Sequence, residues 1–189
     1  MKKHVFFLGL AMVIGLSGCG DETGNENGTD VNTEPQQQEE DMEMEMNHSS
    51  SGEVPATLKV VENPTYEVGS EAIIETDHME GMNGAVATIV GAYDTTAYAI
   101  SYTPVTGGER VENHKWVIQE EIKDAGEQQL EPGTEVTVEA DHMKGMKGAT
   151  AEIDSAEKTT VYMIDYTPTT GGEKVTNHKW VTEEELSAN

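Results

Sequence analysis

The sequence contains an internal repeat, and this repeat limits the fold more than any other feature. When the chain is shifted by 64 residues, Tyr66 to Ile122 align with Leu130 to Leu186 without a gap. Of the 45 aligned pairs from Asp77 to Glu121, 29 are identical. Self-similarity over such a period indicates duplication of one structural unit. The sequence therefore predicts two tandem domains, residues 57–123 and 124–189.

Each copy has the apolar pattern of short strands. Apolar residues alternate over short stretches that end at glycine, proline or polar turns. In the first copy we expect strands at residues 71–76, 85–91, 96–103 and 110–117. Gly107 and Gly108 supply the backbone freedom for a reversal before the fourth strand. The pattern predicts an all-β fold, with two small, partly open SH3-like barrels following a disordered tether.

The expected core of each barrel is small. Tyr98, Ile100 and Tyr102 would share one face of the third strand, because side chains alternate across a strand. A core of this size depends on large aromatic residues, so Trp116 and Trp180 are expected to anchor it. The segments near Glu120 and Glu183 are the ones suited to a helical turn.

The first residues have the features of an export signal. Lys2 and Lys3 precede an apolar run from Val5 to Leu16, which is too short to span a bilayer permanently. Leu16-Ser17-Gly18-Cys19 resembles the lipobox of bacterial lipoproteins. We expect a signal peptide at residues 1–18 and a Cys19 acylated by palmitate-type chains, which would anchor the protein at the outer face of the cell membrane. The alternative is a soluble secreted protein.

The segment that follows, residues 19–56, is expected to be a disordered acidic tether. It is rich in Gly, Asn, Glu, Gln and Ser and cannot bury enough apolar surface to fold. The whole chain has a formal net charge of −25, and removing residues 1–18 would take away two lysines and no acid. Such a charge repels phosphate groups, so nucleic-acid binding is excluded, and it favours cations and a soluble monomer. Cys19 is the one cysteine of the chain, so no disulfide can form within the domains.

Methionine and histidine occur together in three short clusters. Seven of the eight methionines after residue 18 belong to them, and only Met163 stands apart. The clusters are Met42, Met44 and Met46 with His48; His78 and Met79 with Met82; and His142 and Met143 with Met146. Thioethers suit Cu(I), and imidazole with oxygen suits Cu(II). If Met79 to Met82 forms a β-turn, its ends approach each other, so the two sulfurs could face one ion beside His78.

Other interpretations of these clusters remain open. Met79, Met82, Met143 and Met146 could fill the ends of the barrels, as flexible methionines often do. His114 and His178 could brace a loop by hydrogen bonding. The methionines near His48 could belong to a solvated, low-complexity segment.

The repeated motifs carry a family resemblance. Both copies contain Asp-His-Met-x-Gly-Met-x-Gly-Ala, then Tyr-Thr-Pro, then Gly-Gly-Glu-x-Val-x-Asn-His-Lys-Trp-Val. This pattern resembles the YdhK-like lipoproteins of Gram-positive bacteria, which are related to copper-binding lipoproteins of the CopL type. The resemblance covers about Tyr66 to Leu186 and implies surface copper binding. The candidate ligands that it implies are His78, Met79, Met82, His114, His142, Met143, Met146 and His178.

The sequence supports two hypotheses of different classes. The first is a membrane-anchored lipoprotein that binds copper, as Cu(I) or Cu(II), and protects against its excess. The second is a cell-envelope scaffold or adhesion module, which would bind a peptide or wall glycan through Tyr98, Tyr102 and Trp116. An enzyme is not expected, because neither copy contains a recognisable nucleophile with its partners.

Overall fold

The structure, a computed structural model, describes residues 48–189. The expected signal peptide, Cys19 and the tether methionines Met42, Met44 and Met46 lie outside the described residues. The elements are β1 Lys59–Val60, β2 Glu71–Ile74, β3 Val86–Tyr102, β4 Val111–Ile118, η1 Gln119–Glu121, β5 Glu135–Thr137, β6 Thr150–Tyr166, β7 Val175–Thr182, η2 Glu183–Glu185 and β8 Leu186–Ala188. The prediction of an all-β fold is confirmed, and the helical turns lie where they were expected.

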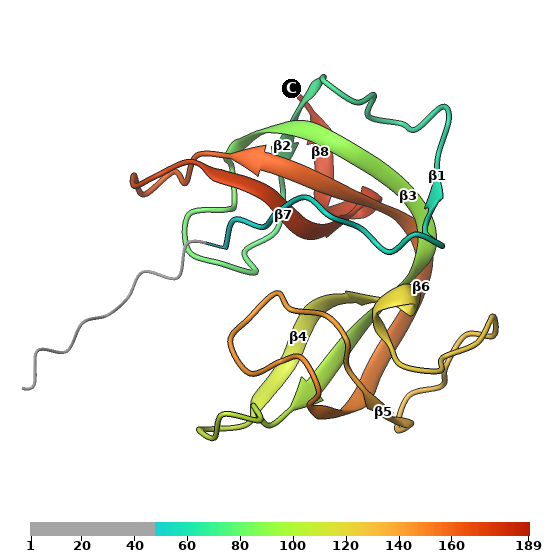
Figure 1. Cartoon of the computed structure of the whole chain (residues 1–189). Coiled ribbons are helices and arrows are strands. Elements are labelled where there is room, and N and C mark those ends of the chain that lie inside the picture. The colour runs from blue at the N-terminus through green and yellow to red at the C-terminus, as the bar shows by residue number, and fades with distance from the viewer. Residues whose placement is uncertain (1–47) are drawn as a thin grey trace, which may run out of the picture. The chain divides into compact units, whose positions relative to one another are not determined.

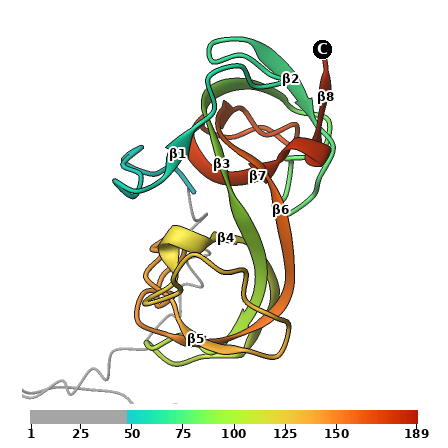
Figure 2. The same ribbon diagram turned by 90° about the vertical axis from the view of Figure 1, so that its right-hand side faces the viewer.

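Two strands of 17 residues each, β3 and β6, dominate the sheet. The sequence predicted two strands, 85–91 and 96–103, where the structure has the single strand β3. The strand continues because β6 pairs with it antiparallel from Ala87↔Tyr166 to Tyr102↔Ala151, with two register shifts. Figures 1 and 2 show these two strands side by side along their whole length.

The pairing of β3 with β6 relates the two repeats by an approximate twofold axis. Thr95 pairs with Thr159, which is the residue 64 positions later and therefore its own counterpart in the second repeat. On either side of this pair, the first half of one long strand lies beside the second half of the other. We call the paired strands β3 and β6 the shared ribbon. Each repeat therefore extends to both ends of this ribbon.

Two hydrophobic cores lie at the two ends of this ribbon, and each contains residues of both repeats. The first core joins the segment from Ala72 to Ala92 with the segment from Tyr162 to Leu186. The second joins the segment from Tyr98 to Ile122 with the segment from Val138 to Ile153. We call these parts of the molecule the first and second lobes. The boundary between repeats at residues 123 and 124 is thus a boundary in sequence, whereas each lobe is built from half of each repeat.

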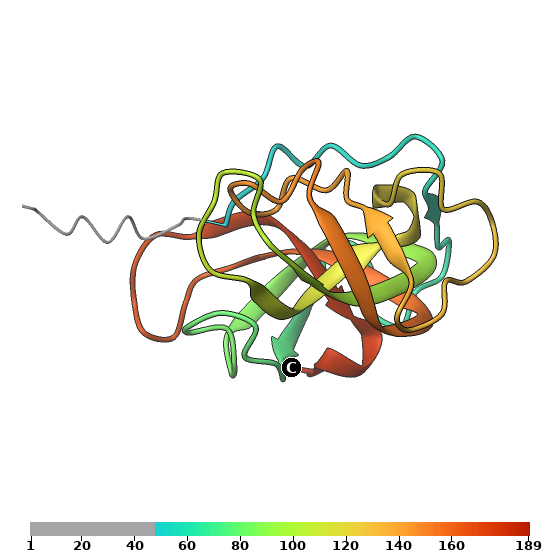
Figure 3. The ribbon, with the colours of Figure 1, turned by 90° about the horizontal axis from the view of Figure 1, so that it is seen from below.

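The shorter strands complete the two lobes. In the first lobe β2 pairs with both β3 and β8, and β7 pairs with β6. In the second lobe β5 lies along β6, as Figure 3 shows, and β4 pairs with β3. Ile122 forms an isolated bridge with Val138, which in the second lobe takes the place of the β2–β8 pairing.

A third cluster of buried residues lies where the long strands pass between the lobes. Trp116 and Trp180 belong to it, together with Ala97 and Ala99 of β3. Tyr98, Ile100 and Tyr102 point to the opposite face of β3 and lie in the second core, as the alternation of side chains predicts. The part of the chain that the structure describes contains no helix long and apolar enough to cross a membrane.

Candidate metal-binding cleft

All five histidines among residues 48–189 line one cleft. Its volume is about 980 Å³. They are His48, His78, His114, His142 and His178. Four of them form two pairs of equivalent residues in the repeat, because His142 follows His78, and His178 follows His114, by 64 positions. The twofold arrangement therefore brings the equivalent histidines of both repeats to a single site.

Each histidine of the Asp-His-Met motif is held by a glutamate of the other repeat. His78 Nε2 lies 2.7 Å from Glu185 Oε1, and His142 Nε2 lies 2.9 Å from Glu121 Oε1. The second oxygen of each carboxylate accepts a tryptophan N–H, from Trp116 at 2.8 Å and from Trp180 at 3.1 Å. The two glutamates lie in the helical turns η1 and η2.

The surroundings of Glu121 and Glu185 keep them ionised. Burial alone would raise the pKa of Glu121, but the charge and hydrogen bond of His142 and the hydrogen bonds of Trp180 and Ile118 bring the pKa below its ordinary value. Burial also opposes ionisation of Glu185, and the hydrogen bond of His78 leads the contacts that lower its pKa.

The contact with glutamate uses one ring nitrogen of His78 and of His142 and leaves the other ring nitrogen available. A carboxylate can only accept a hydrogen bond, so in the neutral ring Nε2 carries the proton and Nδ1 carries the lone pair. Nδ1 of His78 and Nδ1 of His142 are buried and have no hydrogen-bond partner within the described chain. In the neutral form of either ring, a lone pair would therefore lie on a buried nitrogen that has no partner among the described residues.

His114 and His178 reach the cleft from β4 and β7 through a local irregularity. The preceding residues Asn113 and Asn177 have φ values of 51° and 53°. Asparagine tolerates this left-handed conformation better than most residues. The register of each hairpin shifts on both sides of the histidine pair, as in a β-bulge, and bulges redirect side chains. The repeated Asn-His sequence therefore accounts for the placement of these rings.

Burial keeps His114 and His178 neutral. It lowers the pKa of His114 to about 4 and that of His178 to about 3, and repulsion from the neighbouring histidines adds to the effect. His114 Nε2 and His178 Nδ1 are buried without a hydrogen-bond partner in the described residues. Each ring packs edge-on against a tyrosine, Tyr102 or Tyr166, whose hydroxyl also lacks a partner there. Buried polar atoms normally have partners, so this group indicates a place for a ligand.

The two methionines of each motif have different positions. The expected turns are confirmed, since Met82 N–H donates to the Met79 carbonyl at 3.2 Å and Met146 N–H donates to the Met143 carbonyl at 3.1 Å. Met79 and Met143 are half-buried and line the cleft.

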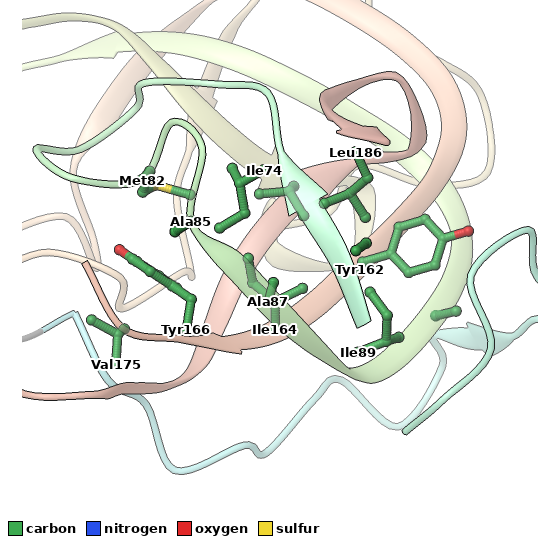
Figure 4. Packing of buried hydrophobic residues seen from close by; sticks show 13 residues of the cluster. Ile74, Met82, Ala85, Ala87, Ile89, Tyr162, Ile164, Tyr166, Val175 and Leu186 are labelled. Carbon is green, nitrogen blue, oxygen red and sulfur yellow. The ribbon is translucent and has the colours of Figure 1, made fainter. Parts of the chain in front are cut away.

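Met82 and Met146 lie elsewhere. They are fully buried in the two cores, and Figure 4 shows Met82 among Ile74, Ala85 and Tyr166. Met79 and Met143 pack against the same two cores but also line the cleft, so only the first methionine of each motif lies at the cleft. The core-filling interpretation holds for Met82 and Met146.

The histidine rings line one cleft, but their side chains do not form a ready-made metal-binding group among the described residues. Among residues 48–189, no three His, Cys, Asp or Glu side chains form a group that could hold a metal ion. The centroids of the His114 and His142 rings are 6.5 Å apart. Two nitrogens on opposite sides of one ion lie about 4 Å apart, because metal–nitrogen bonds are roughly 2 Å long. An ion shared by these two rings would therefore require their side chains to move.

The lining of the cleft favours cations. Five acidic side chains, those of Asp77, Glu80, Glu112, Asp141 and Glu173, contribute to it, against the lysines Lys115 and Lys179. The aromatic residues of the scaffold hypothesis are placed differently. Tyr98 and Tyr102 are fully buried and Trp116 is 5% exposed, so they present no binding face to solvent.

Several residues that shape the cleft were not predicted from the sequence as site residues. Glu121 and Glu185 were expected only as part of helical turns, and their pairing with histidines of the other repeat depends on the exchanged halves. The recurrence of Glu120-Glu121 as Glu184-Glu185 was the available signal. The sequence also placed His48 with the tether methionines, whereas the structure places it in the cleft.

Comparison with known proteins identifies the family. The chain matches "Protein of unknown function (DUF1541)" twice, at residues 68–119 and 132–183. The chain belongs to the DUF1541 family. It is 61% identical over 191 residues to "Uncharacterized protein YdhK" of Bacillus subtilis (strain 168), and this match covers 100% of this chain and 91% of that protein.

Solved structures of this DUF1541 relative share the fold. A crystal structure of ydhK from Bacillus subtilis at 2.00 Å resolution is 70% identical, with a TM-score of 0.74, and the match covers 77% of this chain and 99% of that one. A solution NMR structure of the ydhK C-terminal domain is 74% identical, with a TM-score of 0.62, and covers 65% of this chain and 93% of that one.

Proposed function

We propose that this DUF1541 protein binds copper in the histidine cleft and sequesters it at the outer face of the cell membrane. The observation that carries the proposal is the set of four buried imidazole nitrogens without partners, all in one cleft, on His78, His114, His142 and His178. The role is one of binding rather than catalysis, performed by a monomer, since one chain supplies both halves of the site.

The glutamate–histidine pairs support a metal ligand role. Histidines that bind metals usually donate their other ring N–H to a carboxylate, which fixes the ring and makes the free nitrogen more basic. Glu185 does this for His78 and Glu121 does it for His142. A histidine that only braced a loop would need no free buried nitrogen on its other side.

The donor set favours copper. Imidazole accepts zinc, copper, iron and nickel, and among the divalent ions Cu²⁺ binds a given nitrogen site most tightly. The thioethers of Met79 and Met143 at the same cleft add donors suited to Cu(I). Hydrolytic zinc sites are built from harder ligands without thioether neighbours.

The cellular setting completes the proposal. Acylation of Cys19 would hold the protein at the membrane, and Met42, Met44 and Met46 would supply further soft donors. A metal site outside the cytoplasm is better made from methionine and histidine than from cysteine, whose thiol is readily oxidised there. Copper held in this way is kept from entering the cell.

Copper titration tests the proposal. The chain from Gly20 to Asn189 contains all the residues that the structure describes and can be titrated with Cu(II), and with Cu(I) under reducing conditions, against a competing chelator. We expect copper to bind more tightly than micromolar. Replacing both His114 and His178 with glutamine should weaken copper binding by at least about 100-fold, because losing a residue that merely supports a metal ligand already costs about 10- to 100-fold. Micromolar or weaker binding by the parent chain overturns the proposal.

The methionines provide a matched comparison. Replacing Met79 and Met143 with leucine removes the two sulfurs that line the cleft, and we expect weaker Cu(I) binding. Replacing Met82 and Met146 with leucine changes only the cores, where the similar volumes of the two residues keep the fold. Equal Cu(I) affinity in the two double variants would show that the thioethers of Met79 and Met143 do not bind the ion.

A further inference from the structure

The segment before β1 is fastened along one side of the cleft. We call Ser49–Glu53 the strap. Ser50 N–H donates to the Thr176 carbonyl at 3.0 Å, and Thr176 N–H donates to Ser49 Oγ at 2.9 Å. Ser50 Oγ donates to the Asn177 carbonyl at 2.7 Å, and Asn177 Nδ2 donates to the Ser50 carbonyl at 3.2 Å. The strap therefore lies along β7, where it is bonded to the two residues that precede His178, and Figure 1 shows this segment beside β7.

The strap carries His48 into the cleft. His48 is half-buried and lines the same cleft as the four paired histidines. His48 thus lies at the same cleft as His114 of the first repeat and His178 of the second. Burial also lowers the pKa of His48 itself, which favours the neutral ring that a metal requires.

His48 has no counterpart in the repeat. The residue 64 positions after it is Glu112, a residue of β4. The other four histidines are fixed on strands or on motif loops that pack on them, whereas His48 lies at the end of a segment held by polar contacts. Val54 and Leu58 are the first residues of this segment that pack in a core, so the strap can detach without disturbing either lobe.

We propose that His48 is a fifth ligand of the cleft and that docking of the strap on β7 controls release of the bound ion. This inference rests on the proposed function, because it assigns a further ligand to the same metal site. A docked strap adds an imidazole to the coordination of the ion and covers one side of the cleft. An undocked strap leaves the four paired histidines, which hold the ion less firmly.

Gly52 provides a way to undock the strap while keeping His48. Gly52 has a φ of +78°, and a Cβ atom there would lie 3.1 Å from Cγ of Asn177, the residue that fastens the strap. Gly69 has a similar φ of +89°, and a Cβ atom there would meet nothing within 4 Å. Gly52→Ala therefore combines backbone strain with interference at the docking contact, and Gly69→Ala introduces the strain alone at a position away from the cleft.

The experiment compares His48→Ala, Gly52→Ala and Gly69→Ala in the chain from Gly20 to Asn189. Each protein is loaded with one equivalent of Cu(II), nitrogen ligands are counted from the hyperfine pattern in electron paramagnetic resonance, and release into excess EDTA is timed. We expect His48→Ala to lose one nitrogen ligand and release copper about tenfold faster or more, a loss of the size seen when a supporting residue of a metal site is removed. Gly52→Ala is expected to release copper faster than Gly69→Ala, which should match the parent chain.

The possible failures are distinguishable. If His48→Ala keeps the parent spectrum and release rate, His48 is not a ligand, and copper binding by the paired histidines stands. If Gly52→Ala matches Gly69→Ala in release, docking of the strap does not control the ion. If the parent chain binds no copper, this inference and the proposed function both fail.

Discussion

Single residues explain why the same motif serves both the cores and the cleft. In the Asp-His-Met-x-Gly-Met sequence, the histidine and the first methionine face the cleft, whereas the second methionine fills a core. The histidine is then fixed by a glutamate from the other repeat. One short turn thus supplies side chains both to a core and to the lining of the cleft.

The glutamates that orient the histidines are expected to control metal affinity. Replacing both Glu121 and Glu185 with glutamine removes the carboxylate charge but nearly keeps the shape of the side chain. Without that charge the rings are held less firmly and their free nitrogens are less basic, so copper affinity should fall about 10- to 100-fold. Competition against a chelator measures the loss.

The neighbouring glutamate is the control for this prediction. Glu184 is exposed and has the same charge, so Glu184→Gln changes the net charge without touching a histidine. It should bind copper as the parent chain does. A comparable loss of affinity in Glu184→Gln would show that general charge, not orientation of the rings, is responsible.

At the scale of elements, the loops of one repeat pack against loops of the other. Val105 N–H donates to the Gly145 carbonyl at 2.9 Å, and Thr169 N–H donates to the Gly81 carbonyl at 2.9 Å. A Cβ atom on Gly145 would lie 2.5 Å from Thr106 Oγ1 and 3.0 Å from Pro104 Cβ. The glycine of each Met-x-Gly-Met turn is therefore required by close contact with the Tyr-Thr-Pro loop.

Gly145→Ala should consequently destabilise the fold more than Gly148→Ala. Both glycines have a positive φ, +79° and +83°, so alanine is strained at either position by about 1–2 kcal/mol. A Cβ atom at Gly148 would meet nothing within 4 Å, whereas at Gly145 crowding adds roughly 1–3 kcal/mol. Urea denaturation of the two variants gives the difference, and equal free energies of unfolding would contradict the observed loop contact.

The sequence allowed the elements to be predicted better than their partners. Alternation of apolar residues indicated the strands and the shared face of Tyr98, Ile100 and Tyr102, because the side-chain period of a strand is local. It did not show that 85–91 and 96–103 belong to one strand, since the continuity of β3 depends on its distant partner β6. The His-Met clusters contain residues that line the cleft, but the pattern could not show that Met82 is fully buried in a core while Met79 also lines the cleft.

At the scale of the whole molecule, duplication gathers the histidines of both repeats in one cleft. If each repeat closed on itself, two separate sets of one Asp-His-Met histidine and one Asn-His histidine would result. The pairing of β3 with β6 instead gathers all four into a single cleft. Nothing in the sequence distinguishes closure within a repeat from closure between repeats, because both bury the same faces.

This arrangement predicts the behaviour of a single repeat. Residues 124–189 contain β5, β6 and β7 but only half of each core, so a lone copy would leave the apolar faces of β6 exposed. Two copies can pair their β6 strands around Thr159, the position that pairs with its own counterpart in the intact chain. We expect this fragment to sediment as a twofold symmetric dimer with β-sheet circular dichroism, and to lose its sheet on dilution as the dimer dissociates. A folded monomer would show that each repeat can complete a core by itself, which would make the exchange of halves dispensable for folding.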